Sequence, residues 1–151
     1  MNAPPDFLSR YHTLAELIHS DTAIARGIPN FPDATALENL CRLAQGLDLV
    51  RELLGHPLAI SSGYRSPELN AAVGGVPGSQ HSLGLAADFS CPEFGTPIEI
   101  AQVIVESAIE FDQCILEYGR WMHLSFSDAP RRRVFTIYGH ETGYQIGLWS
   151  A

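Results

Sequence analysis

The spacing of apolar residues in the first third of the chain predicts helices. Apolar side chains recur at steps of three and four over residues 35–54, which is typical of one buried face on a helix of about five turns. That stripe consists of Leu37, Leu40, Cys41, Ala44, Leu47, Val50 and Leu54. Thr13 and Thr35 are each followed three residues later by a glutamate, the capping-box pattern of a helix start. Residues 11–55 are therefore expected to form a helical lead-in that ends at Gly55.

The middle of the chain alternates between short strands and short helices. Residues 57–62 are largely apolar and predict a strand, whereas Ser66 followed by Pro67 is typical of a helix start. Residues 85–90 alternate as a strand, which places Asp88 on the face opposite its large apolar neighbours.

The last third of the chain predicts one helix and then strands. Thr96 begins the sequence Thr-Pro-Ile-Glu, which predicts a capped helix that runs to about residue 110. The expected strands, separated by Gly, Pro or Asp turns, are 113–117, 121–127, 134–138 and 144–149. Because helices come first and a meander of strands comes last, the predicted class is α+β, with N-terminal helices packed on an antiparallel sheet.

Composition narrows the classes of function. The 151 residues suffice for one hydrophobic core, and the 46% of hydrophobic residues indicates a folded chain. Asp and Glu outnumber Lys and Arg by 17 to 9, so nucleic-acid binding through a cationic surface is not expected. No apolar run reaches the roughly 20 residues of a membrane helix, and the N-terminus lacks the pattern of a secretory signal. We therefore expect cytoplasmic synthesis and no membrane insertion.

Cysteines and the single basic run have structural interpretations. Cys41, Cys91 and Cys114 are odd in number and lack C-x-x-C spacing, so they are expected to be buried free thiols rather than disulfides or a zinc knuckle. Three consecutive arginines at 131–133 are interpreted as a solvated turn before a strand.

One histidine and one aspartate stand out by their setting. His81 follows a glycine-rich loop, and Gly84 allows the chain to turn sharply after it. Asp88, flanked by small and apolar residues on the next strand, would be costly to bury without a partner. A metal ion is one such partner and a nearby arginine is the alternative, and the spacing alone leaves both open.

A second histidine lies on a later strand. His123 alternates in step with Trp121 and Ser125, so the three share one face. A lone histidine on a strand is usually structural, but two histidines and one aspartate without a fourth protein ligand suit a catalytic zinc site with an open position. The remaining histidines, which are His12, His19, His56 and His140, are interpreted as surface or structural residues.

Three segments together resemble a known peptidase family. They are Ser61-Ser-Gly-Tyr-Arg65-Ser, the motif Ser79-x-His81-x-x-Gly84-x-Ala86-x-Asp88, and Trp121-x-His123. In order and spacing they are similar to the zinc D-alanyl-D-alanine carboxypeptidases and L-alanyl-D-glutamate endopeptidases, the M15-like peptidases whose fold is shared with the hedgehog signalling domain. The likeness covers roughly residues 11–127, and the helical lead-in looks like that of the phage and prophage branch.

The resemblance implies a site and a domain organisation. It implies that His81, Asp88 and His123 bind one zinc ion and that Arg65 faces the substrate. The chain is then expected to be a single zinc peptidase domain over residues 1–151. Its parts are a helical lead-in at about 11–55, a metal-site core at about 57–127 and a C-terminal hairpin at about 133–150.

The catalytic carboxylate departs from the family pattern. In the family it normally lies three residues before the last histidine ligand, and here that position holds Arg120. The nearest upstream carboxylate is Glu117. A three-residue loop at 118–120 would pair Glu117 with Trp121 and point it to the face of His123, whereas a two-residue loop would send it to the opposite face. We favour Glu117 as the general base, which would take a proton from water and pass it to the leaving amine.

Four side chains are candidates for contact with substrate. Arg65 could stabilise the developing oxyanion or pair with a substrate carboxylate, while its structural alternative is an ion pair with Asp88 or Glu68. Ser79 and Gln80 could donate to the substrate or shape the loop. Trp121 is either a pocket wall or a core aromatic.

The substrate class implied by the resemblance is the stem peptide or cross-bridge of bacterial peptidoglycan. The activity would be that of a D,D-carboxypeptidase or an L,D-type endopeptidase, and a phage or prophage lysis or tail enzyme would reach the wall after release from the cell. The competing interpretations are a non-catalytic zinc-binding module and a virion structural protein with the same fold. The sequence leaves the cleaved bond and the oligomeric state open.

Overall fold

The structure is a computed structural model that describes residues 6–150, and its N-terminal part is helical as expected. The first helices are α1 (Leu14–Ile18), α2 (Asp21–Arg26) and the long α3 (Ala34–Leu54). Helix α3 ends at Gly55, which has a φ of 73° and whose N–H donates to the carbonyl of Arg51. This left-handed ending was predicted and is confirmed.

The start of α3 differs from the prediction. Asp33 is the N-cap residue, and its carboxylate accepts from the N–H of Ala36. Because this cap begins the helix at Ala34, Thr35 already lies inside it, and the predicted capping box at Thr35 is wrong. At α1 the hydroxyl of Thr13 does accept from the N–H of Glu16.

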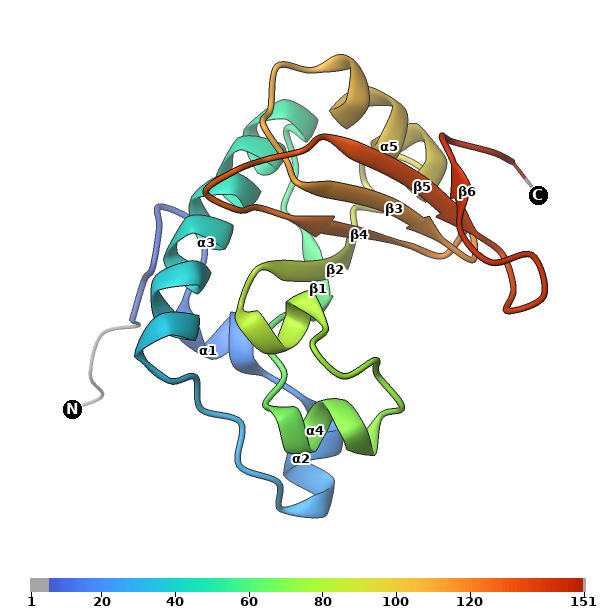
Figure 1. Cartoon of the computed structure of the whole chain (residues 1–151). Coiled ribbons are helices and arrows are strands. Elements are labelled where there is room, and N and C mark those ends of the chain that lie inside the picture. The colour runs from blue at the N-terminus through green and yellow to red at the C-terminus, as the bar shows by residue number, and fades with distance from the viewer. Residues whose placement is uncertain (1–5, 151) are drawn as a thin grey trace.

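Six strands form one sheet in the second part of the chain (Figure 1). They are β1 (Ala59–Ser62), β2 (Ala86–Ser90), β3 (Gln113–Glu117), β4 (Trp121–Ser125), β5 (Arg133–Ile137) and β6 (Gln145–Ile146). Between them lie α4 (Pro67–Ala72), the 3-10 helix η1 (Gln80–Leu83) and α5 (Pro97–Glu106), which ends before the predicted residue 110. The predicted helix start at Thr96 and the cap at Ser66 are both confirmed, and Thr96 forms a capping box with Glu99.

The sheet is mixed, so the expectation of a purely antiparallel sheet is wrong. The strand order is β1-β2-β4-β3-β5-β6, and β3 pairs with β5 in parallel while every other pair is antiparallel. The reason is that both edges of β4 are taken, one by β3 and the other by β2. The chain leaves β4 beside the beginning of β3 and crosses, within residues 126–132, to the free edge of β3. Strand β5 therefore starts at the same end as β3 and runs parallel to it. Strands β5 and β6 pair as the expected C-terminal hairpin, but β6 is much shorter than the strand predicted at 144–149.

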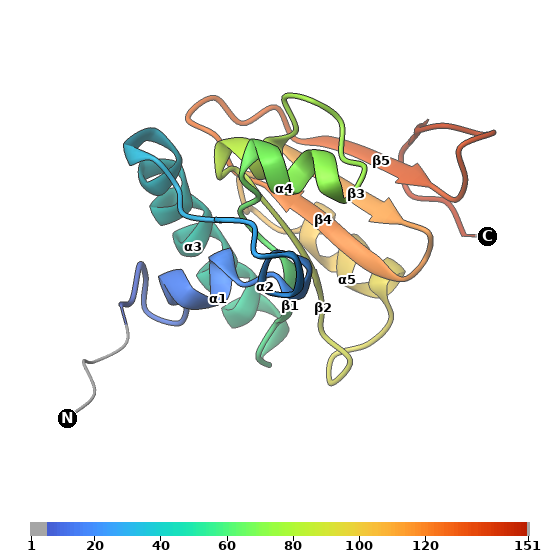
Figure 2. The ribbon, with the colours of Figure 1, turned by 90° about the horizontal axis from the view of Figure 1, so that it is seen from below.

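The two faces of the sheet have different partners. One face carries buried apolar side chains, among them Ala87, Phe89, Cys114, Leu116, Met122 and Leu124, which join the core with α3 and α5. The other face carries Asp88, Glu117 and His123, because strand residues alternate between faces. Figure 2 shows α4 on the side of the sheet opposite α5, so the polar face is bordered by α4 and η1 rather than by the long helices. None of the helices within residues 6–150 is long and apolar enough to cross a membrane.

Gly84, directly after η1, offers a test of how tightly this connection is packed. It has a φ of 77°, and a Cβ there would lie 2.5 Å from the carbonyl oxygen of Ala36 in α3. We expect Gly84→Ala to lower the free energy of unfolding by roughly 2–4 kcal/mol, because left-handed strain and a backbone clash add. Urea unfolding measures the loss.

The control is Gly74→Ala, because Gly74 has nearly the same φ, 76°, but open space around its Cβ position. This variant is expected to lose only about 1 kcal/mol from the strained backbone. Equal losses in the two variants would show that the contact with α3 contributes nothing.

Candidate metal centre

The 3-10 helix η1 places His81 in the interior. The hydroxyl of Ser79 accepts from the N–H of His81 at 3.2 Å, and Gly84 ends the helix in the left-handed conformation. The ring Nδ1 of His81 lies 2.8 Å from the carbonyl oxygen of Gly63, and the N–H of Arg65 donates to the carbonyl of His81 at 3.1 Å. The segment 63–65 therefore holds His81 through both its ring and its backbone.

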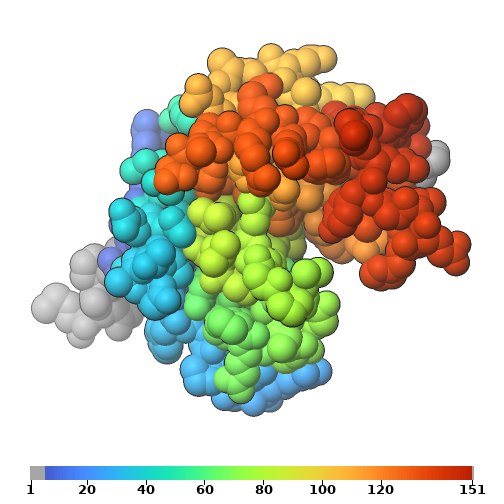
Figure 3. Space-filling view, in the orientation of Figure 1, coloured from blue at the N-terminus to red at the C-terminus, as the bar shows by residue number. Residues whose placement is uncertain are grey.

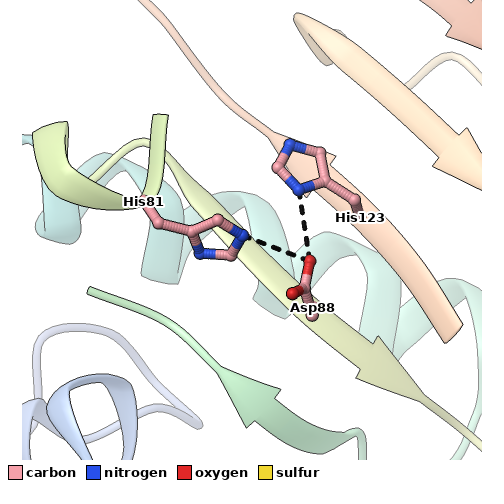
Figure 4. A group of neighbouring side chains, drawn as sticks. All are labelled: His81, Asp88 and His123. Atoms are coloured by element: carbon pink, nitrogen blue, oxygen red, sulfur yellow. Dashed lines mark hydrogen bonds and ion pairs between the residues drawn. The ribbon is translucent and has the colours of Figure 1, made fainter. Parts of the chain in front are cut away.

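Strands β2 and β4 bring the other two predicted ligands together. Asp88 and His123 are directly opposite in the antiparallel register. Asp88 Oδ1 lies 3.1 Å from His123 Nδ1 and 3.3 Å from His81 Nε2 (Figure 4). The ligand atoms of the three residues all lie within 4.8 Å of one another. The structure thus assembles the predicted trio from three different elements.

The hydrogen-bonding capacity of the two histidines fits a cation between them. Each ring has an oxygen beside both of its nitrogens: Gly63 O and Asp88 Oδ1 for His81, and Gln80 Oε1 and Asp88 Oδ1 for His123. A neutral imidazole has only one N–H. If that N–H donates to the oxygen outside the trio, which is Gly63 O or Gln80 Oε1, the other ring nitrogen turns its lone pair towards the Asp88 carboxylate. Two lone pairs and a carboxylate oxygen then converge, which requires a proton or a metal ion among them. Two imidazoles and one carboxylate are a donor set that suits zinc.

The electrostatics of Asp88 agree with that fit. Burial by itself would raise the pKa of Asp88, but the adjacent rings of His123 and His81 outweigh burial and hold the pKa well below its usual range. The group is therefore an anion at neutral pH, as a metal ligand must be.

The β3–β4 hairpin decides where Glu117 points. Glu117 pairs with Trp121, and Tyr118 and Gly119 both have positive φ values of 57° and 66°. This is the predicted three-residue loop, and it places Glu117 on the face of His123, with Oε1 3.8 Å from His123 Nδ1. Arg120, at the family's usual carboxylate position, is exposed in the loop.

Glu117 is held in a state suited to proton transfer. Burial raises its pKa, and the charge of Asp88 raises it further. His123, a hydrogen bond of 3.0 Å from the indole N–H of Trp121, and Arg65 oppose that rise. A carboxylate with a raised pKa and a fixed orientation is well matched to a general base.

Arg65 reaches the same space without a partner. Its Nε is buried and makes no hydrogen bond within the part of the chain that the structure describes. Burial lowers the pKa of Arg65, while Asp88 and Glu117 raise it. The expected structural alternative, an ion pair with Asp88 or Glu68, is absent among residues 6–150. Because Arg65 also lines the cleft, its guanidinium is available to an acidic group of another molecule.

These side chains line one cleft of about 440 Å³. Its walls include Arg65, Ser79, Gln80, His81, Asp88, Glu117, Trp121 and His123, together with Tyr118 and Tyr144. Figure 3 shows the segment around α4 in green and the C-terminal segment in red as separate lobes on this face. The metal trio is therefore open to a ligand rather than sealed in the core.

Two of the candidate substrate residues are already engaged by the protein. Ser79 caps η1, and the amide of Gln80 donates to Asp112 at 2.9 Å and lies 3.4 Å from His123 Nε2. Trp121 lines the cleft, which is one of its two predicted roles, and its indole N–H also donates to Glu117, which was not predicted.

Sequence reasoning missed Asp112 and Tyr144. Asp112 is only 2% exposed and accepts from Arg131 Nε at 2.7 Å, so Arg131 is not merely part of a solvated turn as predicted. A buried aspartate immediately before a strand, with one basic run nearby, is a signal that could have suggested this pair. Tyr144 enters the cleft from the C-terminal hairpin, and no local pattern marks it.

The remaining histidines have structural or surface surroundings, as expected, but the prediction that all three cysteines are buried is wrong for Cys41. His12 is buried and its Nδ1 lies 2.8 Å from Asp48 in α3, which ties the N-terminal segment to that helix. All three cysteines are free thiols, and Cys91 and Cys114 are buried while Cys41 is half-buried.

Fold and site together define an α+β protein with a two-histidine, one-aspartate centre beside a buried carboxylate, the arrangement of a metal-dependent hydrolase. The family model described as peptidase M15 matches residues 10–125, and the chain belongs to this family of zinc-dependent metallopeptidases. Comparison with curated proteins gives no match.

The Asp112–Arg131 pair generates a prediction about stability and pH. A hydrogen bond from Arg131 lowers the pKa of Asp112 against the effect of burial, and Gln80 adds to the lowering. A carboxyl group with a lowered pKa in the folded state stabilises the fold above its unfolded pKa, and this contribution is lost as the pH falls through the folded pKa. Asp112→Asn should therefore be less stable than wild type at neutral pH, with the difference shrinking below the usual aspartate range.

Urea unfolding of both proteins between neutral and acidic pH measures that difference. Asp128→Asn is the control, because Asp128 is an exposed aspartate in the loop between β4 and β5. A stability gap that stays constant down to acidic pH would contradict the ionic contribution of Asp112.

Proposed function

We propose that this chain hydrolyses peptide bonds in bacterial peptidoglycan with the help of one zinc ion held by His81, Asp88 and His123. The observation that carries the proposal is the convergence of two histidine nitrogens and the Asp88 carboxylate in an open cleft, with Glu117 3.8 Å from His123. When bound there, zinc would lower the pKa of its water towards ~7 and polarise the scissile carbonyl.

Glu117 serves as the general base in this proposal. Its raised pKa and its position on the face of His123 support removal of a proton from water, and the Trp121 indole holds one of its oxygens in place. Oε1 is the oxygen on the side of His123 and is free of the indole, so the proton is held there before it passes to the leaving amine.

Arg65 binds the substrate in this proposal. Arg65 lines a cleft that already contains the carboxylates of Asp88 and Glu117, and among residues 6–150 it makes no ion pair there, so its guanidinium is the positive group available to an incoming acid. Peptidoglycan stem peptides carry free carboxylates, which a guanidinium can bind with two parallel hydrogen bonds. Tyr118, Trp121 and Tyr144 supply the aromatic surface of the same cleft.

Metal analysis and turnover test the metal and the base together. We expect wild type to retain one zinc per chain, His123→Ala to lose it, and Glu117→Gln to keep it while turnover falls by about 10² or more. The assay follows new amino groups released from purified peptidoglycan.

Glu68→Gln is the matched control, because Glu68 is an exposed carboxylate on α4 and should leave both zinc and turnover unchanged. Stoichiometric zinc without product from any wall tested would favour a non-catalytic zinc-binding module. A wild-type protein without zinc would contradict the proposal itself.

Arg65→Lys tests how the cleft holds its substrate. Lysine keeps the charge but lacks the planar fork, so we expect KM to rise roughly tenfold or more, with zinc content unchanged. Steady-state kinetics on a soluble stem peptide measure kcat and KM separately. A fall in kcat at constant KM would instead assign Arg65 to the developing oxyanion.

A further inference from the structure

We propose that Gln80 is a positioning residue for His123. Together with Asp112 it determines which ring nitrogen of His123 carries the proton and hence which nitrogen faces the metal. This inference rests on the proposed metal site, and it gives Gln80 a role different from contact with substrate.

The orientation of the Gln80 amide follows from Asp112. Gln80 Nε2 donates to Asp112 Oδ2 at 2.9 Å, and Arg131 holds the same carboxylate with Nε and Nη2 at 2.7 and 2.8 Å. The buried, arginine-bound Asp112 is ionised, so it can only accept hydrogen bonds. The NH₂ of the amide must therefore face Asp112, and its oxygen must face the opposite way.

That opposite direction is His123. Gln80 Oε1 lies 3.4 Å from His123 Nε2, and an amide oxygen can only accept. Nε2 must then carry the proton, which leaves the lone pair on Nδ1, 3.1 Å from Asp88 Oδ1 and within the metal cluster. The other tautomer would set a lone pair against the amide oxygen and place a proton where the metal ligand belongs.

The two histidines are oriented by different means. His81 donates from Nδ1 to a backbone carbonyl, that of Gly63, which no side-chain substitution removes. His123 depends instead on side chains from three places: Gln80 in η1, Asp112 immediately before β3, and Arg131 before β5. Substitution of Gln80 should therefore disturb one histidine and spare the other, which provides an internal control.

Gln80→Leu removes the hydrogen bond at similar side-chain size. Competition with a chelator should show zinc affinity lowered by about 10–100-fold. In zinc-loaded protein with ¹⁵N-labelled histidine, the His123 Nε2–H signal should be protected from solvent exchange in wild type and lose that protection in the variant. The His81 Nδ1–H signal should stay unchanged in both.

Gln102→Leu is the matched control, because Gln102 is exposed on α5, and zinc affinity and both signals should stay as in wild type. A second variant, Asp112→Asn, keeps Gln80 but loses the anion that fixes its amide, so it should weaken zinc binding less than Gln80→Leu does. Wild-type zinc affinity and an unchanged His123 signal in folded Gln80→Leu would overturn the inference.

The same signals can be compared without metal. If wild type bound no zinc, the proposed function would fail, yet protection of His123 Nε2–H in metal-free wild type and its loss in Gln80→Leu would still support the hydrogen bond. The absence of any difference between those two metal-free proteins would overturn the inference independently of the metal.

Discussion

The site depends on one buried carboxylate. Asp88 sits on a strand whose other face belongs to the core, and its oxygen lies within 3.3 Å of nitrogens on two histidines. A carboxylate in that position is stable only with positive charge or hydrogen-bond donors around it. The register that sets Asp88 directly opposite His123 is therefore the constraint that the rest of the site must satisfy. The placement of β2 beside β4 also explains why the sheet is mixed, because it closes the second edge of β4 to β5, which pairs with the free edge of β3 instead.

The elements that carry the three ligands differ from the elements that border the open cleft. The ligands stand on two strands and a short capped helix, and the strands are backed by the apolar core with α3 and α5. The cleft side is bordered by α4, the loop after it and the C-terminal segment, so a ligand can approach without opening the core. A metal site that is supported by the core and open on its polar side is suited to metal-assisted hydrolysis.

Hydrogen bonds from residues outside the trio fix the orientation of the side chains at the site. The carbonyl of Gly63 and the amide of Gln80 lie at the outer nitrogens of the two rings, and the Trp121 indole holds Glu117. Each of these contacts limits a group that could otherwise rotate or change tautomer. The family match ends at residue 125, yet Arg131 and Tyr144 beyond it reach the site through Asp112 and the cleft wall. The C-terminal region thus contributes to the surroundings of the site and not only to the fold.

Local patterns in the sequence determined most of the secondary structure, whereas the resemblance to the peptidase family supplied the trio. The stripe of α3, the caps at Ser66 and Thr96 and the alternation around Asp88 and His123 depend on neighbours a few residues apart, which a sequence displays directly. The loop after Glu117 could be narrowed to two geometries, and only the register with Trp121 chose between them. The parallel pairing of β3 and β5, the burial of Asp112 under Arg131 and the bridge from Asp112 through Gln80 to His123 required the tertiary structure. These contacts join residues from 19 to 43 positions apart. They depend on which strand edges are still unpaired and on which charged groups are buried next to each other, and neither is visible in a local stretch of sequence.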